Sequence, residues 1–154
     1  MKLRTLIAAA VVAAGPVALT APAAFADKDP IYTAKRSNLA LQGYDTVAYF
    51  TVGEPTKGSA EYSTTHNGAE FRFASEENLN LFLGNPDQYA PQYGGYCAWA
   101  VAKGKTAKGD ARRWAIVDDK LYLNYNKGIQ KKWDKDRSGF ITDANTNWPT
   151  VLQD

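Results

Sequence analysis

The sequence holds a single cysteine, Cys97, and a single histidine, His66. A lone cysteine cannot close an intramolecular disulfide, and structural zinc needs four Cys or His ligands, so we expect neither crosslink nor structural zinc. A blue-copper site, which takes two His and one Cys, is excluded for the same reason. The fold must therefore rest on a hydrophobic core, and the 9 Tyr, 4 Trp and 6 Phe supply bulky side chains to fill it.

The first 26 residues have the pattern of a cleaved signal peptide. Lys2 and Arg4 form a short basic start, an apolar stretch spans residues 6–19, and the small residues read by a signal peptidase stand at 24 and 26. The uninterrupted apolar run is shorter than the ~20 residues of a membrane span, and no second run of that length follows. We therefore expect a signal peptide at 1–26, a periplasmic or secreted protein, and no membrane span after cleavage.

Removal of this segment would leave a chain with no net charge. Without Lys2 and Arg4, the 18 Lys and Arg of the sequence fall to 16, which equals the 16 Asp and Glu. The basic residues are also scattered among acidic ones rather than clustered. Nucleic acid and anionic membrane surfaces are therefore not expected as partners.

Residues 38–150 are expected to form one small α+β domain, in which antiparallel β-hairpins pack with short helices. An Asn-Gly pair at 67–68 between two alternating segments predicts a hairpin over 61–73, and residues 114–125 predict a second hairpin. Residues 27–37 are interpreted as a polar leader outside the domain. No internal repeat is evident in the sequence.

Capping residues indicate where the helices begin. Asp45 is placed to cap a short helical turn, and Ser75 is a good N-cap for a helix that ends before Pro86. Two further helical segments are expected at 97–102 and 127–148. The second of these is predicted to break at its Ser-Gly pair, residues 138–139.

Several separated motifs resemble the YHS domain. Residues 66–75 read HNGAEFRFAS and residues 82–89 read FLGNPDQY, which is similar to the hairpin, helix and Asn-Pro-x-x-Tyr ending of that family. The wider chain, with LQGYDTVAYF at 41–50, YGGYCA at 93–98 and LYLNY at 121–125, resembles a secreted bacterial subgroup of YHS proteins. The resemblance covers nearly all of residues 38–150 and implies a YHS-like α+β core.

The resemblance also bears on metal and redox chemistry. Metal-handling YHS modules carry two cysteines, at positions that correspond to Ala74 and Asn78 here. Alanine cannot bind a metal and an amide is a poor ligand for soft metals, so heavy-metal binding is not expected to carry over. Relatives in the secreted subgroup are thought to carry selenocysteine at the position of Cys97, which implies a redox-active thiol there.

Cys97 is the candidate catalytic residue. A thiol at a helix N-terminus, after the turn formed by Gly94 and Gly95, is expected to have a lowered pKa and to form thiolate more readily. The alternative is that Cys97 is a small buried side chain, as most free cysteines are. Because the chain has no second cysteine, turnover would need an unknown redox partner or a small reductant.

Four residues are candidates for the lining of a ligand pocket around this cysteine: Tyr93, Tyr96, Trp99 and His66. The three aromatic residues lie in or next to a Tyr-, Gly- and Pro-rich segment that would form the wall of the pocket. His66 adjoins the first hairpin turn and is also explained as an exposed turn residue.

Residues 134–145 resemble an EF-hand calcium loop. Asp134, Asp136 and Ser138 place oxygen ligands at loop positions 1, 3 and 5, ahead of a glycine at position 6. Asn145 stands at position 12, where a calcium loop has a bidentate Glu, and this removes one oxygen and one charge. The family resemblance instead implies a helix, a glycine break and a second helix here.

Three functions stay open. The first is a thiol-dependent redox or sulfur-handling protein that uses Cys97. The second is a non-catalytic module that binds a metal, haem or small molecule in an aromatic pocket, and the third is a scaffold for protein interaction. A fold does not choose among such functions, so the sequence leaves open both enzymatic activity and the cofactor.

Overall fold

The computed structural model describes residues 28–153, so the predicted signal peptide at 1–26 lies outside the described residues. Within residues 28–153, two antiparallel hairpins and six α-helices form a small α+β domain, as predicted. No helix in this range is long and apolar enough to cross a membrane. The elements, with 3-10 helices written η, are η1 (Leu41–Gly43), α1 (Ala48–Thr51), β1 (Ser59–His66), β2 (Ala69–Phe73), α2 (Glu76–Gly84), α3 (Pro86–Tyr89), η2 (Gln92–Gly95), α4 (Ala98–Ala102), β3 (Asp110–Val117), β4 (Lys120–Asn124), α5 (Lys127–Trp133), α6 (Arg137–Asn147) and η3 (Thr150–Gln153).

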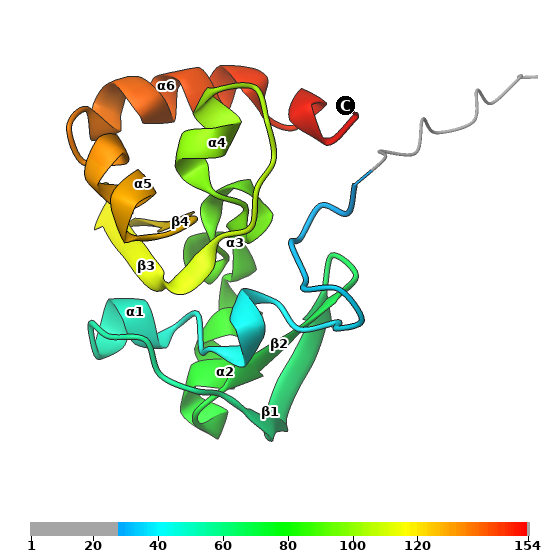
Figure 1. Cartoon of the computed structure of the whole chain (residues 1–154). Coiled ribbons are helices and arrows are strands. Elements are labelled where there is room, and N and C mark those ends of the chain that lie inside the picture. Colours follow the sequence, from blue (N-terminus) through cyan, green and yellow to red (C-terminus); the bar gives the residue numbers. More distant parts are fainter. Residues whose placement is uncertain (1–27, 154) are drawn as a thin grey trace, which may run out of the picture.

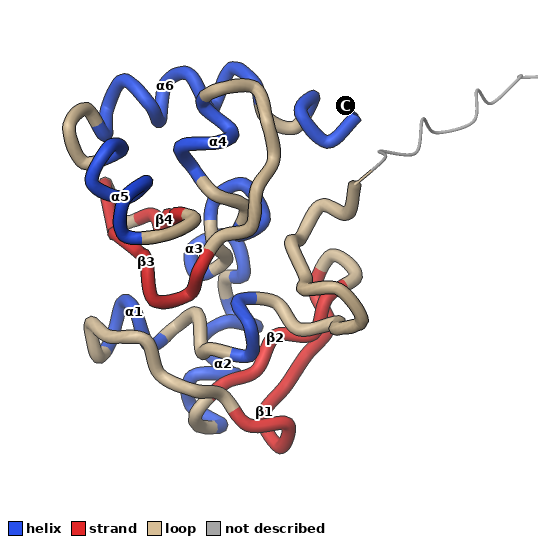
Figure 2. The backbone as a smooth tube through the Cα atoms, viewed as in Figure 1, coloured by secondary structure: helices blue, strands red, loops and turns tan. Residues whose placement is uncertain are grey.

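The hairpins belong to two separate sheets. Figure 1 shows β1, β2 and α2 at one end of the molecule, β3 and β4 in the middle, and α4, α5 and α6 at the other end. Figure 2 shows each hairpin as its own pair of strands, because β1 pairs only with β2 and β3 only with β4. Both hairpins lie where the sequence predicted them, although β3 begins four residues earlier than expected, at Asp110.

Strand β4 stands between two hydrophobic clusters. Leu121 and Leu123 pack into the cluster that contains Phe71 and Phe82, whereas Tyr122 packs into the cluster that contains Trp133. Successive side chains of a strand point to opposite faces, so the predicted alternation of Tyr122 against its neighbours is confirmed. Both faces of β4 are buried, and the strand therefore joins the two cores.

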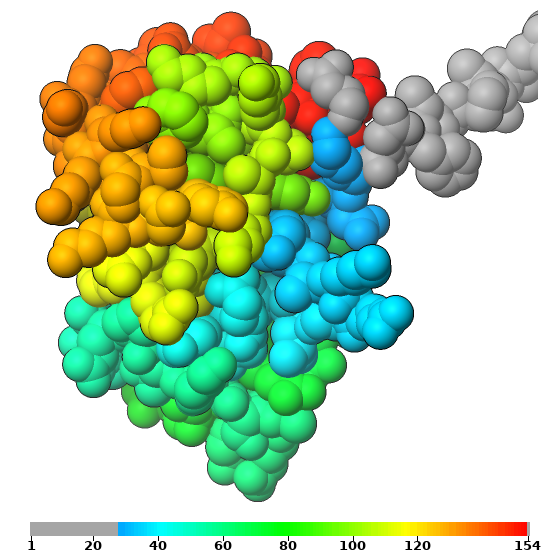
Figure 3. All heavy atoms as spheres, viewed as in Figure 1, coloured from blue at the N-terminus to red at the C-terminus, as the bar shows by residue number. Residues whose placement is uncertain are grey.

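Residues 28–37 pack on the domain and are not a separate polar leader. Ile31 is buried in the first cluster, the Tyr32 N–H donates to the Gly94 carbonyl at 2.9 Å, and Thr33 pairs with Ala40. Figure 3 shows this blue segment lying against the body of the molecule. The predicted domain boundary at residue 38 is therefore too late.

The order of elements in residues 41–89 recurs in residues 92–147, although the sequence shows no evident repeat. Each part has a 3-10 turn, a short helix, a hairpin and two helices, and in each hairpin the first strand has eight residues and the second has five. The register shifts at the same place in both hairpins, between the pairs Ser59–Phe73 and Ser63–Arg72 and between the pairs Asp110–Asn124 and Trp114–Leu123. We call these parts the first and second repeats.

Backbone details support this equivalence. The turns η1 and η2 each have three consecutive residues with positive φ, at 41–43 and 93–95. Each turn is followed by a tyrosine that forms an isolated bridge with a lysine, Tyr44 with Lys57 and Tyr96 with Lys108. The sequences share little beyond the Gly-Tyr pair of each turn and a Lys-Gly-x-Ala segment, and this is why the repeat was missed.

Side-chain caps begin the main helices. Ser75 Oγ accepts from the Asn78 N–H at 3.1 Å, which confirms its predicted role as the N-cap of α2. Asp136 Oδ1 accepts from the Gly139 N–H at 2.9 Å and so caps α6. The predicted pair of helices is therefore confirmed as α5 and α6, but the break lies at residues 134–136 and not at 138–139, which form the first turn of α6.

Candidate functional site

A pocket of about 330 Å³ opens where the two repeats and the N-terminal segment meet. Its volume is at the lower end of the range of about 300–1,000 Å³ that is usual for small-molecule sites. Its lining residues are Tyr32, Ala34, Gln42, Tyr44, Lys57, Lys108, Gly109, Asp110 and Arg112. We call it the lysine–tyrosine pocket.

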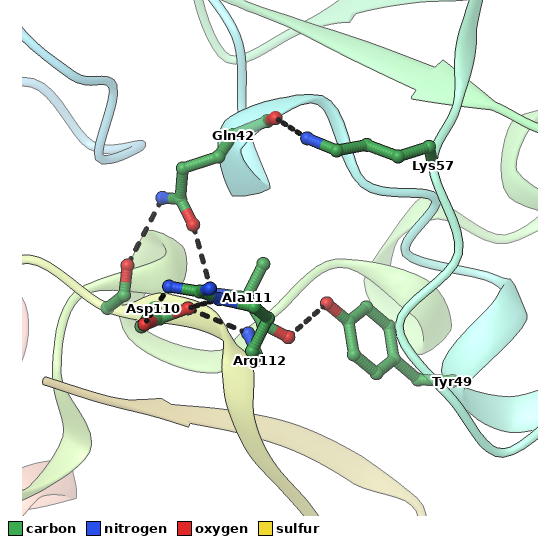
Figure 4. Close-up of polar contacts among 7 residues, drawn as sticks. Gln42, Tyr49, Lys57, Asp110, Ala111 and Arg112 are labelled. Atoms are coloured by element: carbon green, nitrogen blue, oxygen red, sulfur yellow. Dashed lines mark hydrogen bonds and ion pairs between the residues drawn. The ribbon is translucent and has the colours of Figure 1, made fainter. Parts of the chain in front are cut away.

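Gln42 ties the two repeats together beside this pocket (Figure 4). Its Nε2 donates to the Gly109 carbonyl at 3.1 Å, and its Oε1 accepts from the Ala111 N–H at 2.9 Å. Ala111 lies in the bulge of β3, where the register shift leaves it without a partner on β4. The side-chain amide of Gln42 thus forms the hydrogen bonds with the backbone of Gly109 and Ala111 that a neighbouring strand would otherwise form.

Tyr49 completes this junction from α1. Its hydroxyl donates to the Ala111 carbonyl at 2.6 Å, so both backbone groups of Ala111 are bonded by side chains of the first repeat. Burial raises the pKa of Tyr49 well above its ordinary value, with a smaller contribution from Tyr44 and nearby carboxylates, so the hydroxyl stays a neutral donor. The bulge therefore has a fixed position relative to η1 and α1.

Lys57 is held at the edge of the pocket by two contacts. Its Nζ donates to the Gln42 carbonyl at 3.2 Å and lies 4.0 Å from the centroid of the Tyr44 ring. A cation–π contact of this kind contributes about 0.5–1 kcal/mol at an exposed site. Gln42 has a φ of 51°, in the left-handed region that non-glycine residues rarely adopt. Its side-chain and backbone bonds offset that strain.

The lysine–tyrosine pocket has more positive than negative charge. Lys57, Lys108 and Arg112 face one acidic residue, Asp110, whose carboxylate accepts two hydrogen bonds of 3.1 Å from Arg112. Burial raises the pKa of Asp110, but the hydrogen bonds and charge of Arg112 lower it by more, so the carboxylate stays ionised at neutral pH. Neither lysine forms an ion pair with any of residues 28–153.

The four residues predicted to line a pocket around Cys97 do not gather there. His66 and Tyr93 line a different cavity, of about 470 Å³, together with Trp148. His66 packs edge-on against Phe71 and is half-buried rather than an exposed turn residue.

Tyr96 and Trp99 line neither of these two cavities. Tyr96 packs edge-on against Tyr32, and its hydroxyl donates to the Asp29 carbonyl at 2.9 Å. Trp99 is half-buried, and the ammonium groups of Lys103 and Lys132 lie 5.9 and 5.7 Å from the centroid of its ring. Both side chains therefore have structural contacts that account for their positions.

Cys97 is fully buried as the N-cap residue of α4. Its Sγ lies 3.7 Å from Oδ1 of Asn124. Burial raises the pKa of the thiol, and this outweighs the backbone N–H groups of Ala100, Tyr125 and Trp99, which lower it. The expected lowering of this pKa is therefore wrong, because desolvation opposes the thiolate and α4 is only five residues long.

A buried aspartate contacts Ala74 and Asn78, the two residues that stand where the resemblance implies cysteines in metal-handling YHS modules. Asp45 is 0% exposed, and its Oδ2 accepts from the Ala74 N–H at 2.8 Å and from Asn78 Nδ2 at 2.7 Å. Its Oδ1 accepts from the N–H groups of Val47 at 2.8 Å and Ala48 at 3.2 Å. The carboxylate is thus fully engaged by protein donors.

These contacts leave no free side-chain atoms at this position to serve as metal ligands. Ala74 has no ligand atom, and the amide of Asn78 is directed to Asp45. Across residues 28–153, no three His, Cys, Asp or Glu side chains lie together in a way that could hold a metal ion. Ala74 and Asn78 therefore do not fit the metal-binding role of the family's cysteines, and the absence of structural zinc stays a prediction.

The segment that resembles a calcium loop is mostly helical. α6 takes up residues 137–147, so Ser138 lies in its first turn and cannot wrap around an ion. Asp136 caps that helix, and Asp134 accepts from Arg137 Nε at 2.9 Å. The calcium interpretation is therefore wrong, because both carboxylates accept hydrogen bonds from residues in the first turn of α6.

None of the residues that line the lysine–tyrosine pocket was predicted from the sequence as a site residue. The pocket depends on Gln42 reaching the backbone of Gly109, 67 residues further along the chain, and no local pattern reports such a contact. The only available signal was the segment Lys-Gly-x-Ala, which occurs at 57–60 and again at 108–111 and contributes both lysines.

The family model of the YHS domain matches residues 47–93. No curated protein and no solved structure matches the chain. The matched segment begins just before α1 and ends in η2, so it covers most of the first repeat, with its hairpin and the helix capped by Ser75. Residues 47–93 of this chain are therefore a YHS domain.

Proposed function

We propose that the chain is a non-catalytic binding module, built on its YHS domain, that holds a small organic anion in the lysine–tyrosine pocket. The observation that carries this proposal is the pair Lys57 and Lys108, which line one pocket without an acidic partner among the described residues. An anionic ligand would satisfy both ammonium groups. The rings of Tyr32 and Tyr44 would contact the apolar part of the ligand.

The geometry around the pocket favours binding over chemistry. The contacts of Gln42 and Tyr49 fix the walls before any ligand arrives, which reduces the cost of ordering side chains on binding. The only carboxylate of the lining, Asp110, is held by Arg112 and stays ionised, so it is not a candidate general acid near neutral pH. Recognition therefore rests on charge and ring contacts.

Benzoate is expected to bind at this pocket, whereas benzamidine, which has the same ring and the opposite charge, is not. Lys57→Met should weaken benzoate binding about tenfold, because one charge-assisted contact is worth about 1.5–3 kcal/mol before screening by solvent. The measurement is a titration followed by amide NMR shifts, with the largest shifts expected at Gly109 and Ala111. Raised salt should weaken binding further.

The matched control is Lys131→Met, which removes an equally exposed lysine on α5, away from the pocket. It should leave the benzoate affinity unchanged. Equal binding of benzoate and benzamidine, or shifts confined to another surface, would show that the pocket does not select anions and would remove the proposal.

A thiol-dependent redox or sulfur-handling function through Cys97 has less support than the binding function. The sulfur is fully buried and burial raises the pKa of the thiol, so both access and thiolate formation are hindered. His66 lines a different cavity with Tyr93 and so gives the cysteine no base. For these reasons we do not assign Cys97 a role in turnover.

We also propose that the module works outside the cytoplasm, on the basis of the predicted signal peptide. N-terminal sequencing of protein recovered from the cell envelope or the medium is expected to begin at Asp27. Ala26→Leu, which places a large residue at the cleavage position, should yield protein that keeps its N-terminal segment. Exported wild-type protein that retains residues 6–19 would contradict the proposal.

A further inference from the structure

Cys97 occupies, in the second repeat, the position that Asp45 occupies in the first. Each follows the tyrosine of its turn, and each precedes the short helix of its repeat, α4 or α1. The backbone N–H of Asp45 donates to the Thr56 carbonyl at 2.8 Å, and that of Cys97 donates to the Ala107 carbonyl at 2.9 Å. The two acceptors each stand one residue before the lysine of the repeat.

The two side chains also face the same set of backbone donors. Asp45 accepts from the N–H groups two and three residues ahead and from Ala74, the residue directly after β2. Cys97 Sγ faces the N–H groups of Trp99 and Ala100, again two and three residues ahead, and of Tyr125, the residue directly after β4. The donor set that holds a carboxylate in the first repeat therefore recurs around the sulfur.

A side-chain amide stands beside each of these positions. Asn78 Nδ2 donates to Asp45 at 2.7 Å. In the second repeat, Asn124 is 0% exposed, and its Oδ1 lies 3.7 Å from the sulfur and accepts from the Trp99 N–H at 3.3 Å. Its Nδ2 is buried without a hydrogen-bond partner, as is Nε1 of Trp133. An unpartnered buried donor is costly, so the site around Cys97 has hydrogen-bonding capacity that a thiol does not use.

We propose that the surroundings of Cys97 form an anion cradle that accommodates cysteine sulfinate, the product of two successive oxidations by hydrogen peroxide. In the first step the sulfur attacks one peroxide oxygen, the O–O bond breaks, and sulfenic acid and water form. In the second step the sulfenate reduces another peroxide in the same way, which gives sulfinate and a second water. Each step oxidises sulfur by two electrons and reduces one peroxide.

A sulfinate has the shape that this cradle holds elsewhere in the chain. Like the carboxylate of Asp45, it carries two oxygens and one negative charge on the atom next to Cβ. One oxygen would accept from the N–H groups of Trp99 and Ala100, the first of which donates to Asn124 Oδ1 at 3.3 Å while the sulfur is a thiol. The other oxygen would accept from Tyr125 and, after a half-turn of the Asn124 amide that exchanges Oδ1 for Nδ2, from Asn124 Nδ2. Burial of the sulfur and the raised pKa of the thiol make the oxidation slow. Ordinary thiols do not reduce a sulfinate, so the modification is a lasting change of state and not a catalytic cycle.

The direct test is Cys97→Asp in the full chain, because aspartate places the same two oxygens in the cradle without any oxidation. The variant should unfold cooperatively at pH 7, with a melting temperature within about 4 °C of the wild type. The matched control is Val101→Asp, which puts a carboxylate on the same helix at a position that is also 0% exposed but has no donor set. The control should lose cooperative unfolding.

Failure of Cys97→Asp to fold, or a loss as large as that of Val101→Asp, would overturn the proposal. A second measurement uses the native thiol. Prolonged treatment with hydrogen peroxide should add two oxygen atoms to the chain by intact mass, relative to Cys97→Ser, and the oxidised protein should keep its melting temperature. Unfolding on oxidation would show that the cradle does not accept the anion. None of these outcomes depends on benzoate binding, so the proposal stands or falls separately from the binding function.

Discussion

Asp45→Ala is expected to lower the free energy of unfolding by about 3–5 kcal/mol, since it strands buried donors without an acceptor. The carboxylate is 0% exposed and accepts from three backbone N–H groups and from Asn78 Nδ2. These donors come from the start of α1, the end of β2 and the first turn of α2. The change therefore loosens the joint between three elements of the YHS domain and is measurable by urea unfolding.

Two controls distinguish the loss of these contacts from the general effect of removing a carboxylate. Asp143→Ala removes an exposed aspartate on α6 and should change stability by no more than about 0.5 kcal/mol. Asp45→Asn keeps the shape of the side chain and one acceptor oxygen but turns an NH₂ group toward two donors. Its free energy of unfolding should therefore lie between those of the wild type and Asp45→Ala. If Asp45→Ala is as stable as Asp143→Ala, the carboxylate does not hold the joint.

The hairpins of this fold could be predicted because their signals are local. Asn67 and Gly68 adopt φ values of 48° and 86°, which a two-residue hairpin turn requires and which an Asn-Gly pair accepts readily. The second turn places Asp118 and Asp119 at 49° and 57° without a glycine, and there the alternation of the flanking strands was the useful signal. The start of β3 was missed because its bulge interrupts that alternation.

The helix break near the C-terminus shows how one local signal can override another. Ser138 and Gly139 disfavour a helix interior, and the pair therefore predicts a break between two helical segments at that point. In the structure the cap at Asp136 begins α6 just before them, and glycine in a first turn costs little because its N–H is bonded to the cap. The stronger signal was the capping aspartate.

The repeat and the lysine–tyrosine pocket could not be predicted from the sequence. The repeats share an order of elements and a backbone path, but few side chains, because Asp45 and Cys97 fill equivalent positions with different chemistry. The pocket arises only when Gln42 bonds to the bulge of β3, which brings Lys57 and Lys108 to one cavity. Contacts between residues so far apart in sequence leave no periodic pattern to detect.

The N-terminal segment crosses the second repeat at Gly94, and this crossing leaves no room for a side chain. A Cβ at residue 94 would lie 1.8 Å from the carbonyl oxygen of Pro30, and the residue has a φ of +59°. The Gly94 carbonyl also accepts from the Tyr32 N–H at 2.9 Å. Close contact and hydrogen bonding thus both require the segment to lie directly over this glycine.

Gly94→Ala is therefore expected to displace the segment and to lower the free energy of unfolding by about 3 kcal/mol or more. Loss of the buried Ile31 side chain accounts for about 1.5–3 kcal/mol, and an alanine in the left-handed region adds about 1–2 kcal/mol. Because Tyr32 and Ala34 line the lysine–tyrosine pocket, the same change should also weaken benzoate binding. Urea unfolding and the benzoate titration measure the two effects on one sample.

The matched control is Gly84→Ala at the end of α2, where a Cβ would have open space and φ is not in the positive range. Alanine is the better helix former, so this variant should be as stable as the wild type or more stable by up to about 1 kcal/mol. Faster proteolysis between residues 28 and 37 in Gly94→Ala, and not in Gly84→Ala, would show that the stability is lost where the N-terminal segment passes over residue 94. Equal stability of the two variants would mean that the segment does not depend on Gly94, because the segment can shift away from the new methyl group without loss of its burial.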